Sequence, residues 1–309
     1  MATPQLAILL STYNGETYLA EHLDSLLDQS MHEFVLVVRD DGSQDGTWEI
    51  LQDYAGRYPQ KINLVPGNNT NLGASNSFSV LMEYVLQHKA ALGLEKAYMM
   101  FCDQDDVWRR DKIELQWRAM QQCEQDHAEQ PVLIHSDLAV VSADGDLMAE
   151  SMAHYQGLET ERNRFHHVVL SNLVTGCTAF FNEALARRAS PIAGDATMHD
   201  WWLALVATAF GRVHYMEQSL VQYRQHGANV IGAREKIPDG LRDKSFWKRV
   251  VQPGANPHLA EVARQAGVFR RYFGNQLGVR QRTSLIAAAC LAVRVGVIQR
   301  LLFKLLRKF

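Results

Sequence analysis

The sequence predicts an α/β fold in which helices flank a mostly parallel central sheet, with a helical extension at the C-terminus. Over the first hundred residues, short continuous apolar runs alternate with segments whose apolar residues recur at helical spacing. Continuous apolar runs are typical of strands that are covered on both faces. Repeated strand–helix–strand units favour a right-handed, doubly wound parallel sheet. A chain of 309 residues, 47% of them hydrophobic, is long enough to bury such a core.

Residues 6–10 are all apolar and predict the first strand. Four leucines then recur on one face of an amphipathic helix: Leu19, Leu23, Leu26 and Leu27. The continuing alternation predicts strands at 34–38, 62–65 and 97–102 and helices over 47–58 and 77–91. In the less regular second third we expect short strands at 132–134, 138–141 and 178–181, a buried helix over 201–210 and an alternating strand over 212–223.

The composition changes after about residue 232, where glycine and proline become frequent and only helical patterns follow. We therefore divide the chain into a domain at 1–232 and a helical extension at 233–309. From residue 280 onward there are seven Lys or Arg residues and no Asp or Glu. Apolar residues of this tail gather on one side of a helical wheel, as in helices that lie on an anionic membrane surface. A helix packed on the core or on a second copy is the alternative.

The whole chain has a net charge of −3, which gives no indication of nucleic-acid binding. Its apolar stretches are all shorter than the ~20 residues needed to span a membrane. The first residues lack the pattern of a secretory signal. Four widely spaced cysteines favour a reducing compartment over a disulfide framework or a zinc site. These observations predict a cytoplasmic protein, peripheral at the inner face of the membrane.

Three carboxylates follow the strand expected at 97–102: Asp103, Asp105 and Asp106. Carboxylates this close raise each other's pKa unless a cation neutralises them. Oxygen-rich clusters are typical ligands of Mg²⁺ or Mn²⁺, which bind one or two carboxylates together with substrate phosphates. The cluster therefore predicts a divalent cation beside a phosphorylated ligand. A solvated turn followed by a helix cap would contain the same residues.

Polar loops also follow the first two strands. Asp41 ends the strand at 34–38, where a carboxylate can accept hydrogen bonds from a ribose or a base. Tyr13 follows the first strand and offers a ring that can stack on a nucleobase, with Glu16 as an acceptor nearby. Ligands of open parallel sheets bind beyond the carboxyl ends of the strands. These loops and the Asp103 cluster therefore predict one shared site.

Each loop taken alone has a simpler explanation. Thr12 or Asn14 would cap the next helix, and Asp–Gly sequences are typical of turns. The sequence contains neither GxxxxGK[ST] nor GxGxxG after the first strand, which argues against P-loop and dinucleotide-binding proteins. A diphosphate bound without a glycine cradle needs another counter-charge, and the Asp103 cluster with its cation would supply it.

Four motifs in this order resemble the family 2 glycosyltransferases of GT-A fold: Ser11-Thr12-Tyr13-Asn14, Asp40-Asp41-Gly42-Ser43, Asn71-Leu72-Gly73 and Asp103-Gln104-Asp105-Asp106. The continuation Val107-Trp108, with Lys112 beyond it, is similar to bacterial rhamnosyltransferase-like members of capsule or O-antigen biosynthesis. The resemblance covers about residues 5–230. It implies a GT-A catalytic domain at 1–232 that transfers a sugar, rhamnose among the candidates, with inversion. The donor would be a nucleotide-diphosphate sugar and the acceptor a saccharide or a lipid-linked molecule of surface-polysaccharide synthesis.

The resemblance also implies roles for individual residues. Asp200 would be the catalytic base, and Asp105 with His226 would hold the Mg²⁺ or Mn²⁺ ion. Family members often carry Glu-Asp where this chain has His199-Asp200, so the role of the first position is open. The donor would be contacted by Thr12, Tyr13, Asn14, Glu16, Asp41, Asn71, Gly73 and Asp103. Contacts with the acceptor or the donor sugar would come from Asp106, Trp108 and His199.

Two other functions remain compatible with the sequence. A nucleotidyltransferase also uses metal-binding carboxylates on an α/β sheet. It normally has a Gly-, Arg- or Lys-rich loop after its first strand, however, and residues 11–16 contain no basic residue. A non-catalytic protein that binds a sugar nucleotide would carry the same donor motifs. Asp200 separates these functions, although an Asp at the start of a helix is also a common N-cap.

Overall fold

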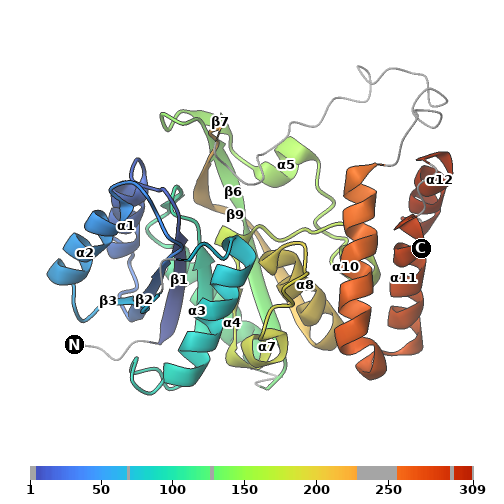
Figure 1. Ribbon diagram of the computed structural model, residues 1–309, viewed down its shortest axis with the longest axis horizontal. Helices are drawn as coiled ribbons and strands as arrows, with labels where there is room; N and C mark the ends of the chain where they lie inside the picture. The colour runs from blue at the N-terminus through green and yellow to red at the C-terminus, as the bar shows by residue number, and fades with distance from the viewer. Residues whose placement is uncertain (1–4, 68–69, 126–128, 228–255, 293–295, 308–309) are drawn as a thin grey trace.

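The computed structural model describes residues 5–67, 70–125, 129–227, 256–292 and 296–307 (Figure 1). One central sheet runs through the middle of the molecule, with helices on both of its faces. The helices nearest the C-terminus stand together at one side, next to α8 (His199–Phe210). The structure thus confirms the α/β fold and the helical C-terminal region.

Within the described residues the sheet has nine strands, in the order β3-β2-β1-β4-β8-β6-β9-β5, with β7 paired to β6. The parallel half consists of β3 (Ile62–Leu64), β2 (Phe34–Asp40), β1 (Leu6–Thr12) and β4 (Tyr98–Cys102). The short β8 (Phe180–Phe181) runs antiparallel to both β4 and β6. The predicted parallel order therefore holds for the N-terminal half, and the sheet as a whole is mixed.

Both faces of the parallel half are covered, as its continuous apolar runs predict. Alternate side chains of β1 enter two separate apolar clusters. Ala7 and Leu9 pack into the cluster that contains Phe78 of α3, whereas Ile8 packs into the one that contains Leu23 of α1. The helices of this half are α1 (Leu19–Leu27), α2 (Thr47–Arg57), α3 (Ala74–His88) and α4 (Lys112–Glu124).

The two short strands expected at 132–134 and 138–141 are one strand, β6 (Val132–Val141). Between them His135, Ser136 and Asp137 are buried, and the pairing of β6 with β9 (Arg212–Arg224) is irregular there. Polar residues that suggest a break are thus accommodated inside the strand. The remaining elements are β5 (Val107–Trp108), β7 (Leu147–Ala149), α5 (Met152–Gln156), α6 (Phe165–Val168), η1 (Gly176–Thr178) and α7 (Glu183–Ala189).

The C-terminal region consists of α10 (Pro257–Phe273), η2 (Gly274–Gln276), α11 (Val279–Ala289), η3 (Cys290–Ala292) and α12 (Gly296–Leu306). Trp202 of α8 packs against Phe269 and Phe273 of α10, with ring centroids 5.4 and 5.6 Å apart. The expected boundary near residue 232 lies outside the described residues, so the division at 232 stays a prediction. Among the described helices, none combines the length and the apolar character needed to cross a bilayer.

Candidate active site

A cavity of about 550 Å³ opens where the carboxyl ends of β1, β2 and β4 meet the N-termini of α3 and α8. Eight of the residues singled out from the sequence line it: Tyr13, Asp41, Asn71, Gly73, Asp103, Asp105, His199 and Asp200. The expected convergence of separate acidic loops on one cavity is therefore observed. The chemical roles of these residues stay predictions.

Three other residues singled out from the sequence hold the loops after β1 and β2 together and do not line the cavity. The hydroxyl of Thr12 is buried and donates to Oδ1 of Asp40 at 2.9 Å. Oδ1 of Asn14 accepts from the backbone N–H of Gln44 at 2.8 Å. Glu16 accepts from the N-cap N–H of α2 at 3.1 Å. These contacts stabilise the rim of the cavity, and a direct contact of the three with the donor stays a prediction.

Gln104 joins the loop after β4 to the loop after β1. Its Oε1 accepts from the backbone N–H of Tyr13, and its Nε2 donates to the backbone oxygen of Tyr13, both at 2.9 Å. The Tyr13 side chain is thereby placed on the cavity, where 47% of the residue is exposed. Gly15 leaves room for these two hydrogen bonds between Gln104 and Tyr13, because a Cβ at residue 15 would lie 2.3 Å from Oε1 of Gln104.

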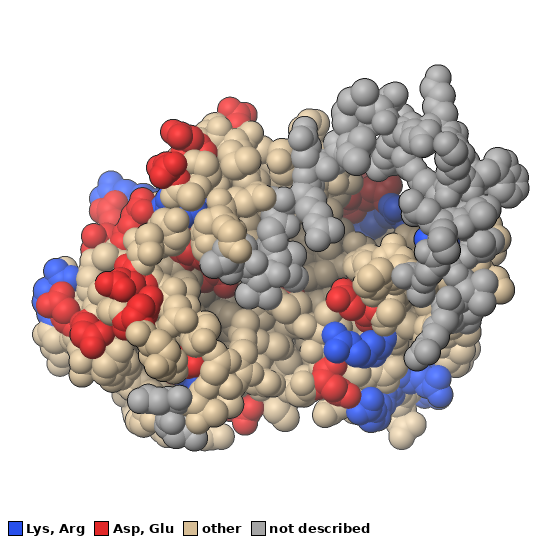
Figure 2. Space-filling model, turned by 45° about the horizontal axis from the view of Figure 1, so that its top comes forward, with Lys and Arg blue, Asp and Glu red and all other residues tan. Residues whose placement is uncertain are grey.

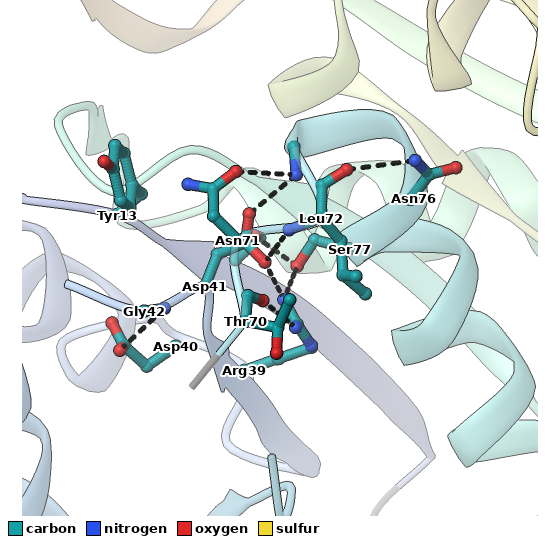
Figure 3. A network of polar contacts seen from close by, with 12 residues as sticks. Tyr13, Arg39, Asp40, Asp41, Gly42, Thr70, Asn71, Leu72, Asn76 and Ser77 are labelled. Atoms are coloured by element: carbon teal, nitrogen blue, oxygen red, sulfur yellow. Dashed lines mark hydrogen bonds and ion pairs between the residues drawn. The ribbon is translucent and has the colours of Figure 1, made fainter. Parts of the chain in front are cut away.

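A buried network fixes Asp41 (Figure 3). Arg39 is 3% exposed and forms an ion pair with Oδ1 of Asp41, while its Nη1 also donates to Ser77 at 2.9 Å. The backbone N–H groups of Leu72 and Gly73 donate to the two carboxylate oxygens of Asp41, both at 2.8 Å. A carboxylate has about four acceptor positions. Three of the acceptor positions of Asp41 are occupied by Arg39, Leu72 and Gly73, which leaves one position for a ligand.

Asn71 and Gly73 place the N-terminus of α3 at the cavity. Gly73 has a φ of 75°, a conformation that L side chains rarely adopt, and its N–H also donates to Oδ1 of Asn71 at 3.1 Å. The helix begins at Ala74, three residues before the expected position, because Asp41 on another strand binds the backbone just before it. The partial positive charge of this helix end faces the cavity and favours an anionic ligand.

The carboxylates after β4 lie at different depths. Asp103 is partly buried in the cavity wall, where burial, with the charges of Asp105 and Asp200, raises its pKa to about 7. Asp106 lies beneath the cavity and is fully buried, so its pKa is raised well above the usual value, first by burial and then by Asp103 and Asp105. Such a cluster is electrostatically costly without a counter-charge.

The donor set fits a hard divalent cation on the cavity side. Nε2 of His226 lies 2.7 Å from Oδ2 of Asp105, which brings together the two metal ligands expected from the resemblance. Ligand atoms of Asp103, Asp106 and Cys177 also lie within 4.8 Å of one another. Burial raises the pKa of the Cys177 thiol, however, and a neutral thiol is a poor ligand for Mg²⁺. The carboxylate oxygens of Asp103 and Asp105, which line the cavity, are therefore the better ligands.

Asp106 and Trp108 form part of the support beneath the cavity rather than its lining. Trp108 is 3% exposed, and Nζ of the fully buried Lys112 lies 3.7 Å from its ring centroid. Lys112 also donates to Gln116 at 2.7 Å. This places an amino group behind the acidic loop, which explains why the sequence has a lysine just beyond it. A direct contact of Asp106 or Trp108 with a substrate stays a prediction.

Asp200 lies in the first turn of α8 and is 9% exposed. Its Oδ1 accepts from the backbone N–H of Trp201 at 2.6 Å. Burial raises its pKa to about 7, against hydrogen bonds from Trp201, Gly176 and Asn172 that favour the charged form. A carboxylate with a pKa near neutrality suits a general base. The helix N-terminus further stabilises its ionised form.

His199 is a neutral imidazole in the cavity wall. It is 3% exposed, stacks on Phe78 with ring centroids 4.3 Å apart, and meets Phe101 edge-on at 5.0 Å. Burial lowers its pKa to about 3. Neither ring nitrogen has a hydrogen-bond partner among the described residues, which suits a contact with a bound substrate. Gly176 lies against this ring, because a Cβ there would be 2.8 Å from Nε2 of His199.

Several supporting residues are not identifiable from the sequence pattern. Gln104 stands inside the acidic motif, and its position between carboxylates is the only local signal. Arg39 lies near the end of an apolar strand, and no local sequence pattern indicates that its side chain is buried. Asn172 and Gly176 belong to the irregular segment between β7 and α8, which carries no periodicity. The contacts that all four residues make with the site form only in the folded chain.

Residues 7–188 match the family model described as Glycosyl transferase family 2. The chain is 28% identical to the dTDP-rhamnosyl transferase RfbG of Shigella flexneri over 290 residues, which cover 90% of this chain and 91% of that protein. It is 32% identical to the putative teichuronic acid biosynthesis glycosyltransferase TuaG of Bacillus subtilis (strain 168) over 117 residues, 38% of this chain and 42% of that protein.

Solved structures show the same fold. S. aureus TarS matches with a TM-score of 0.56 at 14% identity, over 93% of this chain and 43% of that chain. Its fragment 1–349, solved in complex with UDP, matches with a TM-score of 0.53 at 15% identity, over 94% of this chain and 81% of the fragment. These likenesses confirm a GT-A-like fold. The family model spans more than half of the sequence and includes the loops that line the cavity on β1, β2 and β4, so the chain belongs to glycosyl transferase family 2 and is a glycosyltransferase.

Proposed function

We propose that this protein transfers a sugar, with inversion, from a nucleotide-diphosphate donor to a hydroxyl group of an acceptor in surface-polysaccharide synthesis. One observation carries the proposal. A single cavity is lined by the aromatic ring of Tyr13, the carboxylate of Asp41, acidic residues of the β4 loop, and Asp200 at the start of α8, whose pKa is raised to about 7. These groups suit a nucleobase, a diphosphate and a reacting sugar bound in one cavity.

The donor side favours a nucleobase that carries a ring N–H. The exposed ring of Tyr13 stacks on the base, and the remaining acceptor position of Asp41 receives this N–H, which uracil, thymine and guanine present and cytosine and adenine lack. The relative named a dTDP-rhamnosyl transferase and the fold neighbour solved with UDP both carry pyrimidine nucleotides in their names. Deoxythymidine-diphosphate rhamnose is therefore the first donor to test.

Mg²⁺ or Mn²⁺ completes the donor side in this proposal. Asp105 and His226 would hold the ion, with Asp103 on the same wall of the cavity. Bound there, the ion supplies positive charge next to the diphosphate and neutralises the charge that develops on the leaving nucleotide. The N-terminus of α3 adds a fixed partial positive charge on the same ligand.

Asp200 performs the proton transfer. Its carboxylate accepts the proton of the acceptor hydroxyl while that oxygen forms a bond to the anomeric carbon. The bond from the anomeric carbon to the diphosphate oxygen breaks in the same step, and the nucleoside diphosphate leaves with the electron pair. The neutral His199 beside Asp200 donates a hydrogen bond to the acceptor or to the transferred sugar. No covalent intermediate on the enzyme is needed.

The C-terminal helices suit a peripheral position on an anionic membrane leaflet. Ile298, Leu301 and Leu305 recur on one stripe of α12 and are 47%, 45% and 55% exposed. Figure 2 shows many acidic side chains, with some basic ones, over the side of the molecule that carries α1 and α2, and side chains of both charges toward the C-terminal helices. Residues 280–309 contain no acidic residue, and an exposed apolar stripe in such a segment favours binding to anionic lipid.

A panel of nucleotide sugars, each tested with and without Mn²⁺, examines this proposal directly. We expect one pyrimidine nucleotide sugar to raise the melting temperature by mass action, more strongly with Mn²⁺, and to release nucleoside diphosphate when an acceptor is present. Pyrophosphate release from a nucleoside triphosphate and a sugar phosphate would instead indicate a nucleotidyltransferase. Binding without any turnover in the presence of membrane-derived acceptors would indicate a non-catalytic protein.

A further inference from the structure

A second cavity, of about 180 Å³, lies between the 157–173 segment and α12. Apolar residues line its interior, and Arg162, His167 and Arg307 bring basic groups to it. We propose that this cavity is an acceptor subsite that binds the phosphate group of a lipid-linked saccharide. The inference rests on the proposed glycosyl transfer and names the acceptor class for it.

The charges in the cavity already hold an anionic group of the protein itself. The carboxylate of Glu159 lies 3.1 Å from Nε of Arg162 and 2.6 Å from Nη2 of Arg307. The hydrogen bond from Arg307 lowers the pKa of Glu159, so this carboxylate is ionised. Two guanidinium groups face a single carboxylate, which leaves one positive charge in excess. Guanidinium groups bind phosphate oxygens in the same forked geometry as they bind carboxylates.

His167 adds a further polar group without a partner. Its Nδ1 is buried and has no hydrogen-bond partner among the described residues, while its ring lines the cavity. Burial and the neighbouring His166 lower its pKa, so the imidazole is neutral and can donate from one nitrogen. Buried polar atoms are normally paired. A phosphate oxygen in the cavity would supply the partner.

The second cavity adjoins the candidate active site. Leu158 and Leu173 line both cavities, so the two share a wall. The residue before Leu173 is Asn172, which hydrogen-bonds to Asp200. An acceptor that presents its hydroxyl to Asp200 would cross Leu158 and Leu173 to place its phosphate beside the two arginines.

The far side of the second cavity is formed by the amphipathic helix. Phe303 of α12 lines the cavity, and Leu301 and Leu305 on the same helix are exposed. A phosphate held next to a helix with exposed apolar residues is an arrangement that suits a lipid phosphate or diphosphate. A free saccharide would gain nothing from the apolar stripe. The acceptor class is therefore a sugar linked through phosphate to a long apolar chain.

Calorimetric titration of the full chain tests the subsite. In buffer that contains Mg²⁺ the donor cavity is first filled with excess thymidine diphosphate, and farnesyl diphosphate, pyrophosphate or farnesol is then titrated. We expect farnesyl diphosphate to bind the nucleotide-saturated protein and to bind at least about tenfold more tightly than either pyrophosphate or farnesol. Equal affinity for pyrophosphate would overturn the lipid-linked assignment, and no binding by either phosphate would overturn the subsite itself.

Substitutions distinguish an anion-binding site from a salt bridge that only fastens α12 to the rest of the protein. Arg162→Gln should weaken farnesyl diphosphate binding about tenfold, whereas Arg164→Gln, an exposed arginine outside the cavity, should leave it unchanged. Glu159→Gln removes the internal competitor, so the affinity should rise about threefold or more. If Glu159 only fastens α12, Glu159→Gln lowers the melting temperature and leaves the affinity unchanged or weaker, which would contradict the proposal.

The same titration keeps this inference apart from the proposed function. Thymidine diphosphate is titrated in the first step, and we expect Arg162→Gln to leave its affinity unchanged, because the nucleotide occupies the donor cavity. Failure of every pyrimidine nucleotide to bind would count against glycosyl transfer. Normal nucleotide binding and donor turnover, together with no effect of Arg162→Gln or Glu159→Gln on farnesyl diphosphate, would count against the acceptor subsite only.

Discussion

Nε2 of His226 lies 2.7 Å from Oδ2 of Asp105, although the two residues are 121 positions apart in the chain. The end of β9 thus returns to the acidic loop after β4. His226 is held there partly by Tyr18, with ring centroids 5.1 Å apart. β5 begins two residues after Asp105 and pairs with β9, and this pairing brings the two candidate cation ligands together.

Replacement of His226 by Asn tests this pair. We expect His226→Asn to raise the Mn²⁺ concentration for half-maximal turnover by about tenfold or more, because one ligand of the ion is lost. A Mn²⁺ titration of nucleoside diphosphate release measures it. His214→Asn, on the exposed side of the same strand, is the matched control and should leave the titration unchanged. An unaltered Mn²⁺ dependence in His226→Asn would remove the histidine from the metal site.

The base role of Asp200 is tested by Asp200→Asn. We expect kcat to fall by a factor of about 10² to 10⁴, because the acceptor hydroxyl loses its proton acceptor. The affinity for the nucleotide sugar, measured by calorimetry, should change by less than about twofold, because Asp200 acts on the acceptor. Asp195→Asn changes an exposed carboxylate just before α8 and should keep full turnover. Full turnover in Asp200→Asn would assign the proton transfer to another group.

The pH dependence of turnover follows from the same residue. Burial raises the pKa of Asp200 to about 7, and only the ionised carboxylate can accept a proton. The rate kcat/KM should therefore rise with pH, reach half of its maximum near pH 7 and level off above it. The residual activity of Asp200→Asn should not show this rise. An identical profile in both proteins would place the titration elsewhere.

Asp200 also makes the fold less stable at high pH. Its folded-state pKa of about 7 lies above the usual 3.8, so the folded protein binds this proton more tightly than the unfolded chain. The contribution of Asp200 to the free energy of unfolding thus falls as the pH rises from about 4 to about 7. Asp200→Asn should be more stable than the parent at pH 8, by roughly 1–3 kcal/mol, and the difference should shrink toward pH 4. Urea unfolding at both pH values measures it.

The buried Arg39–Asp41 pair should contribute strongly to stability. Arg39→Met leaves Asp41 as a buried charge without its cation, so we expect the free energy of unfolding to fall by about 3–5 kcal/mol. Arg57→Met breaks the exposed pair with Asp53 and should cost less than about 1 kcal/mol. Urea unfolding compares the two variants. Equal losses would mean that the network around Asp41 adds nothing beyond a surface ion pair.

The hydrogen bonds between Gln104 and the Tyr13 backbone should control donor affinity. In Gly15→Ala the new Cβ would lie 2.3 Å from Oε1 of Gln104, which displaces Gln104 and releases Tyr13. We expect KM for the donor to rise about tenfold with a smaller change in kcat. Gln104→Ser removes the same hydrogen bonds, so the double variant should be no weaker than either single variant. Additive losses in the two substitutions would show that the residues act independently.

The sequence alone determines the order of strands and helices in the N-terminal half and the chain positions of the acidic loops. Those features depend on local periodicity and on the rule that parallel strands present their carboxyl ends at one edge. Asp41 and Asp105 meet at one cavity for that reason, whereas Asp200 reaches the cavity at the N-terminus of α8. The family motifs are likewise local, because each is a short run of neighbouring residues.

Only the tertiary structure decides which of those residues face the cavity. Thr12, Asn14 and Glu16 hold neighbouring loops together, and Trp108 packs on Lys112 beneath the site. The partners of these residues lie on other segments, so no local pattern reveals the direction of their side chains. The pKa of Asp200 and the pairing of Asp105 with His226 also arise only when the folded chain excludes water and brings distant residues into contact.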